Sequence, residues 1–219
     1  MKTLYIERST GECRDGSWVE KLDLEGVGRI VVGTGPGSFA GIRSALAFAQ
    51  GYALGKKCEV LGLPSACALA ADYFVSEAHQ SPITKHPAPS TQHQAPSTKH
   101  QAPSTQHQAP STKHQSPPFA VVGDARQGKF WIALFEGYRL VCDIFQVERE
   151  TLPYRVPQGV KVTTPDAKRI DAVLKEVFGE CYIGGGTPTP EGLRRFAEAN
   201  PDILKPEPLP IYLNPAVRN

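Results

Sequence analysis

Residues 29–55 constrain the fold more than any other part of the chain. The stretch begins with the β-branched run Ile30, Val31 and Val32, continues through a glycine-rich turn at 33–37, and reaches Ser38, a residue type that commonly caps a helix. The order is therefore strand, tight turn and helix. A second apolar strand follows at 58–63, and a strand–helix–strand unit favours parallel pairing with a right-handed crossover.

The helix expected over residues 38–55 has two apolar faces. At 100° per residue, Phe39, Ile42, Leu46, Ala49 and Ala53 fall on the face that we expect to pack on the sheet. The opposite face is made mainly of small residues with two aromatic flanks, namely Ala40, Ser44, Ala47, Phe48, Gly51, Tyr52 and Gly55. A row of small residues allows a second helix to approach closely. We interpret this face as a partner-binding surface; an ordinary buried helix within one domain is the alternative.

Composition excludes several classes of protein. The chain has 219 residues, enough for one or two small globular domains, and a net charge of +2, which gives no basic surface for binding nucleic acid on its own. No run approaches the roughly 20 apolar residues of a membrane span, and no signal-peptide pattern opens the chain, so we expect a cytoplasmic protein without membrane contact. The cysteines lack metal-binding spacing and are expected to be reduced core residues; they are Cys13, Cys58, Cys67, Cys142 and Cys181.

The other segments predict two α/β domains, residues 1–80 and 119–219. Strands are expected at 3–6 and, with imperfect alternation, at 17–24, and a helix at 66–76. Residues 119–123, 129–136 and 139–147 predict an antiparallel meander. A strand at 160–163 precedes a helix capped by Thr164 and ended by Gly179. A strand at 181–183, a helix from Thr189 to about residue 199 and an extended tail complete the chain.

Residues 81–118 repeat with a period of seven. Each unit carries proline and no large apolar residue, so neither a helix nor a coiled-coil seam can form, and we predict a disordered insertion. One histidine recurs in every unit, at His86, His93, His100, His107 and His114. Because no acidic or cysteine co-ligands accompany them, we predict no metal site.

The sequence allows two hypotheses for a nucleotide-binding site. The segment from Gly35 to Ala40 fits GxGxxG/A, but the next strand ends without the acidic residue that would hold a ribose, which disfavours a dehydrogenase. Glu7 and Asp124 could instead hold a metal, with Gly184 and Gly185 near ATP phosphates, as in an ATP-dependent kinase. The alternative is that these residues only shape turns. We treat them as a vestigial nucleotide site and predict no bound cofactor and no catalytic set.

Several motifs together resemble one family. Gly35, Pro36, Gly37, Ser38, Phe39, Ala40, Gly41, Ile42 and Arg43 resemble the GPGSFTGLR signature of TsaB, the tRNA threonylcarbamoyladenosine biosynthesis protein. The likeness continues through residues 62–65, through the DARQG turn at 124–128 and into the segment PIYL at 210–213. The first motif is specific to the family, and the others support it.

The resemblance implies an actin-like fold of two related α/β domains without its own catalysis. TsaB-like proteins support the TsaD-type transferase subunit, together with a TsaE-type ATPase, in modifying tRNA, and TsaB meets TsaD through a helical bundle. The matching helix here is the one over residues 38–55. This chain departs from the family in a shortened N-terminal domain, because only residues 25–28 stand where the family has a further helix. An actin-like kinase and a diverged protein-interaction module are the other hypotheses, and self-association as a homodimer is a further expectation.

Overall fold

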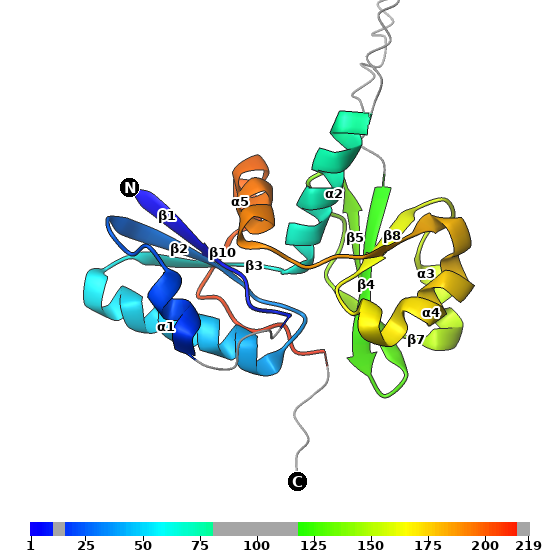
Figure 1. The fold of residues 1–219 in the computed structure, drawn as a ribbon, viewed down its shortest axis with the longest axis horizontal. Helices are drawn as coiled ribbons and strands as arrows, with labels where there is room; N and C mark the ends of the chain where they lie inside the picture. The colour runs from blue at the N-terminus through cyan, green and yellow to red at the C-terminus, as the bar shows by residue number, and fades with distance from the viewer. Residues whose placement is uncertain (11–15, 81–117, 214–219) are drawn as a thin grey trace, which may run out of the picture.

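The computed structural model describes residues 1–10, 16–80 and 118–213. The disorder expected for residues 81–118 falls on 81–117, outside the described residues, except at Pro118, which is the first residue of a strand. Over the described part, the chain forms two mixed sheets separated and flanked by helices, which confirms the α/β class (Figure 1).

The first sheet contains the strand–helix–strand unit. Its strands are β1 (Lys2–Ile6), β2 (Val27–Gly33), β3 (Glu59–Leu63) and β10 (Lys205–Pro206), in the order β1-β2-β3-β10. The first three are parallel, which confirms the pairing expected for β2 and β3, and α1 (Phe39–Lys56) joins β2 to β3. Strand β10 pairs antiparallel with β3, so the end of the chain returns to the sheet formed by its beginning.

The second sheet is built on a long hairpin. Strands β4 (Pro118–Arg126) and β5 (Lys129–Glu136) pair antiparallel, and β8 (Lys161–Thr164) and β9 (Tyr182–Gly185) extend the sheet in parallel from β4. The expected third strand of the meander is divided into β6 (Arg139–Leu140) and β7 (Phe145–Glu148). Both pair with β5 at different positions, so the antiparallel meander is confirmed although its last strand is interrupted.

Helices separate the two sheets and cover their outer faces (Figure 1). Helix α1 covers one face of the first sheet, while α2 (Ala66–Gln80) and α5 (Pro190–Ala199) lie between the sheets. Helices α3 (Leu152–Arg155) and α4 (Ala167–Phe178) close the far face of the second sheet. Short 3₁₀ turns complete the connections: η1 (Gly16–Lys21), η2 (Arg149–Thr151), η3 (Gly179–Cys181) and η4 (Pro201–Ile203).

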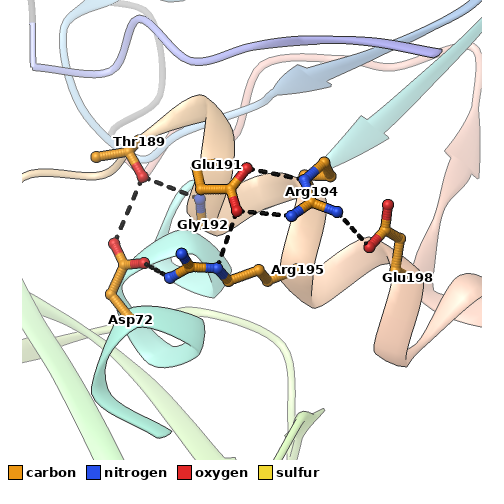
Figure 2. Close-up of polar contacts among 7 residues, drawn as sticks. All are labelled: Asp72, Thr189, Glu191, Gly192, Arg194, Arg195 and Glu198. Carbon is orange, nitrogen blue, oxygen red and sulfur yellow. Dashed lines mark hydrogen bonds and ion pairs between the residues drawn. The ribbon is translucent and has the colours of Figure 1, made fainter. Parts of the chain in front are cut away.

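The central core joins both halves of the chain through α2 and α5. Leu193 and Phe196 of α5 are fully buried, and a Cβ added at Gly192 would lie 2.6 Å from the carbonyl oxygen of Ala68 on α2. Figure 2 shows the polar rim of this contact, in which Arg195 reaches Asp72 at 3.3 Å. Because half-exposed ion pairs contribute little, burial of apolar side chains supplies most of the stability here.

Two local predictions differ from the structure. Residues 17–24 were expected to form a strand, but Trp18, Val19 and Leu22 belong to and follow the 3₁₀ helix η1 and pack on the core beneath α1. Their three- and four-residue spacing fits a helical turn, which explains the poor strand alternation. Helix α4 begins after Asp166, because Thr164 still belongs to β8 and its hydroxyl accepts from the Asp166 amide.

The cysteine prediction is partly wrong. The described cysteines are free thiols, and Cys67 is fully buried, as expected for a core residue. Cys142 is exposed, because it lies where the chain leaves the second sheet between β6 and β7.

Candidate functional site

The loop before α1 is anchored to the start of α2. Gly35 has φ +90°, a conformation that favours glycine, and its amide donates to the Ser65 hydroxyl at 3.0 Å. The Ser65 amide donates in return to the Gly35 carbonyl at 2.8 Å. These reciprocal bonds fix the direction in which α1 leaves the sheet.

The turn after β1 lies directly on the signature segment. A Cβ at Gly37 would collide with the carbonyl oxygen of Ser9, and one at Gly41 would collide with that of Arg8. The Ser38 amide donates to the Ser9 carbonyl at 2.5 Å, and the Ser38 hydroxyl accepts from the Gly41 amide, which confirms Ser38 as the N-cap. The glycines of the signature are thus required for close backbone packing.

One face of α1 packs on the first sheet, largely as expected. Ile42, Leu46 and Ala49 are buried there, and Ala45 joins them. Phe39 was expected on this face but is 56% exposed at the first position of the helix. Its ring lies 5.6 Å from that of Tyr212 in the returning tail.

The small-residue face of α1 points away from the sheet. Ala40, Ser44 and Ala47 are exposed, and a Cβ added at Gly51 or Gly55 would meet no described atom within 4 Å. Within the described residues, this part of the expected partner-binding surface is therefore uncovered. We define the outer face of α1 by these five residues: Ala40, Ser44, Ala47, Gly51 and Gly55.

The two aromatic members of the expected surface are partly covered by the chain itself. Phe48 lies 5.4 Å from Trp18 of η1, ring centre to ring centre, and 6.2 Å from Tyr52. The Tyr52 hydroxyl donates to the Leu24 carbonyl at 3.0 Å. Both rings are half-buried, so they border the outer face of α1 on the side of residues 18–24.

The charge on α1 has one sign. Its sequence contains no Asp or Glu, while Arg43 and Lys56 are exposed, followed by Lys57 at the C-cap. The Arg43 guanidinium lies 4.8 Å from the centre of the Phe39 ring. A surface of small residues with cationic ends favours an apolar partner helix that carries carboxylates.

Glu7 is placed as a buried carboxylate at the end of β1. One carboxylate oxygen, Oε1, accepts from the Ser9 amide at 2.6 Å, and Oε2 is buried without a hydrogen-bond partner among the described residues. A Cβ at Gly33 would collide with this second oxygen. Burial raises the pKa of the Glu7 carboxyl, and the hydrogen bonds from Ser9 oppose that rise.

Asp124 lies in a different setting, among charged side chains at the end of β4. Its carboxylate pairs with Arg169 at 2.7 Å and with Arg126 at 3.5 Å, and its amide donates to Asp166 at 2.9 Å. Burial raises the pKa of the Asp166 carboxyl, against the effect of the Asp124 amide and of Arg169. The arginines neutralise the carboxylate charge that a metal ion would require.

The glycines expected near phosphates belong to a strand. Gly184 and Gly185 end β9, and the Gly184 carbonyl accepts from the Thr163 hydroxyl at 2.7 Å. A Cβ at Gly185 would lie 2.5 Å from Cβ of Ala167, so this glycine lets the start of α4 approach the sheet. Each member of the expected nucleotide site therefore makes a structural contact of its own within the described residues.

Two kinds of feature are absent from the described residues. They contain no group of three or more His, Cys, Asp or Glu side chains placed to hold a metal ion. In the same part of the chain, no helix is both long and apolar enough to span a bilayer.

The sequence did not predict the contacts around the signature segment or those around Asp124. The turn formed by Arg8 and Ser9 covers the signature segment, and the signal for it was the spacing of Gly37 and Gly41, which requires a close neighbour. Asp166 and Arg169, the partners of Asp124, come from a helix start some 40 residues later in the chain. No local pattern marks that pairing.

Comparison with known proteins agrees with this geometry. Residues 19–93 match the family model described as "TsaD: tRNA N6-adenosine threonylcarbamoyltransferase". No curated protein matches the chain.

Solved structures match over most of the chain. YeaZ from Pseudomonas aeruginosa has a TM-score of 0.56 at 18% identity, with 90% of this chain and 80% of that chain covered. A second structure, an uncharacterized protein with similarity to peptidase YEAZ from Pseudomonas aeruginosa, has a TM-score of 0.52 at 17% identity, with 92% and 80% covered. The actin-like fold expected from the family resemblance is therefore confirmed as YeaZ-like, and the TsaD model match supports the resemblance at the level of sequence.

Proposed function

We propose that this chain, which combines a match to the TsaD family model with a YeaZ-like fold, is a non-catalytic subunit in the threonylcarbamoylation of tRNA. In this proposal, the outer face of α1 binds a TsaD-type transferase subunit. A TsaE-type ATPase then acts on the same complex, and tRNA is contacted through the complex rather than by this chain alone. The main support for this proposal is that the outer face of α1 is uncovered within the described residues.

The outer face of α1 has the properties of a helix-binding surface. Five small residues at helical spacing let the backbone of a second helix come close, and close helix approach gives extensive van der Waals contact. Phe48 and Tyr52 form a half-buried aromatic border along one side, while Arg43 and Lys56 lie toward the two ends. A partner helix with small residues and flanking carboxylates would match this surface in shape and in charge.

The kinase hypothesis has weaker support. Arg126 and Arg169 already neutralise Asp124, and the Glu7 carboxyl is buried with a raised pKa. Calorimetry with Mg-ATP separates the two functions, because tight binding by the isolated chain would favour the kinase.

The interface is tested with the TsaD-type subunit of the same organism. Ala47→Glu and Gly51→Leu add bulk to the outer face of α1, and we expect each to weaken association at least about tenfold while circular dichroism of the free chain stays unchanged. Ala172→Glu introduces the same change on an exposed position of α4 and should bind normally. Normal binding by both α1 variants would refute the interface.

The proposed role in tRNA modification is tested separately, by complementation in cells. In a strain that lacks its own TsaB, we expect the chain to restore threonylcarbamoyladenosine, measured by mass spectrometry of tRNA nucleosides, and Ala47→Glu to fail. If α1 variants lose binding to a different protein while tRNA modification is unaffected, the chain is a diverged interaction module.

A further inference from the structure

The outer edge of β1 is one of the two edges of the first sheet. Strand β1 pairs only with β2 among the described residues, and no other described strand lies beside it. Figure 1 shows β1 at the outer border of this sheet, on the side away from β10. An edge strand presents a row of backbone donors and acceptors to a further strand.

The hydrogen-bonding groups on that edge can be assigned. The Lys2 amide donates to the Gly26 carbonyl, so the backbone of Lys2 faces the β2 side. Since successive residues of a strand alternate, Leu4 and Ile6 also bond toward β2, whereas Thr3 and Tyr5 direct their amides and carbonyls outward. Two residues are thus available to pair with a further strand.

The edge lacks the features that usually prevent strand pairing. From Thr3 to Ile6 it contains no proline, glycine or charged residue, and Thr, Tyr and Ile are typical strand residues. Only Lys2 carries charge, and it is held at the strand end by an ion pair with Asp23 at 2.5 Å. The middle of the edge is therefore open to pairing.

The strand is complementary to itself. In an antiparallel pair centred on Leu4, Thr3 lies opposite Tyr5 of the second copy and Lys2 lies opposite its Ile6, so the two Lys2 side chains are kept apart. The outward-facing residues then form hydrogen-bonded pairs, which supply about four backbone hydrogen bonds across the axis. Leu4 and Tyr5 pack on opposite faces of the sheet, so each would meet a side chain in the second copy.

We propose that two copies of this chain associate through antiparallel pairing of their β1 strands, which makes the two first sheets continuous. The interaction is separate from the proposed function, because it uses the sheet edge and leaves the outer face of α1 open. A short edge buries little area, so we expect a weak dimer with a dissociation constant on the order of 10–100 µM.

The test measures the mass of the full chain by sedimentation between about 5 and 500 µM. The native chain should shift from monomer to dimer over this range. Thr3→Pro removes an outward amide without touching the bonds to β2, and we expect it to weaken dimerisation at least about tenfold, while Thr3→Val, which keeps the amide, should dimerise normally.

A crosslink tests the register without depending on the proline variant. Facing residues of a non-hydrogen-bonded antiparallel pair lie about 4.5 Å apart at Cα, within disulfide range. Because Cys142 is an exposed thiol that would form crosslinks of its own, all chains in this test carry Cys142→Ser. Under mild oxidation Leu4→Cys should then give a disulfide dimer, whereas Thr3→Cys and the chain without a new cysteine should not. A chain that stays monomeric at every concentration would overturn the proposal. Dimers that persist in Thr3→Pro but are lost in Ala47→Glu would also overturn it, because they would show that the chain self-associates through α1.

Discussion

At the residue scale, the glycines of the signature segment are constrained by the backbone that packs against them. Gly37 and Gly41 face backbone oxygens of Ser9 and Arg8, which cannot move aside as a flexible side chain can. Gly33 has a different neighbour, the buried carboxylate of Glu7. The segment is thus a structural support that positions α1, and binding is assigned to the helix surface beyond it.

Glu7 gives a prediction about pH. Burial raises the folded-state pKa of its carboxyl above the ordinary value of 4.5, so the folded state holds this proton more tightly than the unfolded state does. Its contribution to stability is therefore complete below about pH 4.5 and is lost as the pH rises through the raised folded-state pKa. The fold therefore loses this contribution as the pH rises above the range in which the unfolded chain is protonated.

We expect Glu7→Gln to raise the melting temperature near pH 7, by roughly 2–4 °C for each kcal/mol of relief. The amide keeps an oxygen that can accept from the Ser9 amide. Melting curves of both proteins across pH 4.5–8 check this, and the difference between them should shrink toward pH 4.5. A constant difference over that range would mean that Glu7 does not titrate with a raised pKa.

At the element scale, two helices use glycine in opposite ways. Gly192 of α5 lies against the backbone of Ala68, whereas a Cβ added at Gly51 of α1 would meet no described atom within 4 Å. Neither glycine has a positive φ. Alanine favours a helix over glycine at both positions, so any difference between the two substitutions reports packing.

Gly192→Ala should therefore destabilise the protein by about 1–3 kcal/mol, because α5 must move away from α2. Gly51→Ala should stabilise it by about 0.5–1 kcal/mol through helix propensity alone. Urea unfolding of both variants provides the measurement. If Gly192→Ala were as stable as Gly51→Ala, the contact between α2 and α5 would have to be looser than described.

An element can be predicted from the sequence when neighbouring residues determine it, and is missed when contacts with distant residues determine it. Helix α1 was predicted with its cap and with Ile42, Leu46 and Ala49 facing the sheet, because periodicity, Ser38 and the glycine turn are all local signals. Residues 17–24 were predicted wrongly, because Trp18 takes its conformation from packing on Phe48, a residue 30 positions later. The neutralisation of Asp124 by Arg169 depends on the pairing of β4 with β8 and is equally non-local.

At the scale of the whole molecule, the layers tie the two ends of the chain together. The described residues stack as α1, the first sheet, the pair α2 and α5, the second sheet, and then α3 with α4. Residues after Leu204 then cross back to the first sheet, where Pro208 is buried against Gly62 and the Ile211 amide donates to the Thr34 carbonyl at 2.9 Å. No local pattern in the sequence indicates this return, since the tail was expected only to be extended.

The returning tail should protect β3. A chain that ends at Leu204 loses the antiparallel pairing of Lys205 and Pro206 with β3 and the burial of Pro208, and we expect it to unfold with about 1–3 kcal/mol less stability. Hydrogen exchange locates the effect, because amides of β3 should exchange faster while those of β8 in the second sheet change little. Equal acceleration in both sheets would mean that the tail stabilises the molecule as a single cooperative unit, and no acceleration in β3 would show that the pairing contributes nothing. The second sheet thus serves as an internal control, since the described tail contributes no strand to it.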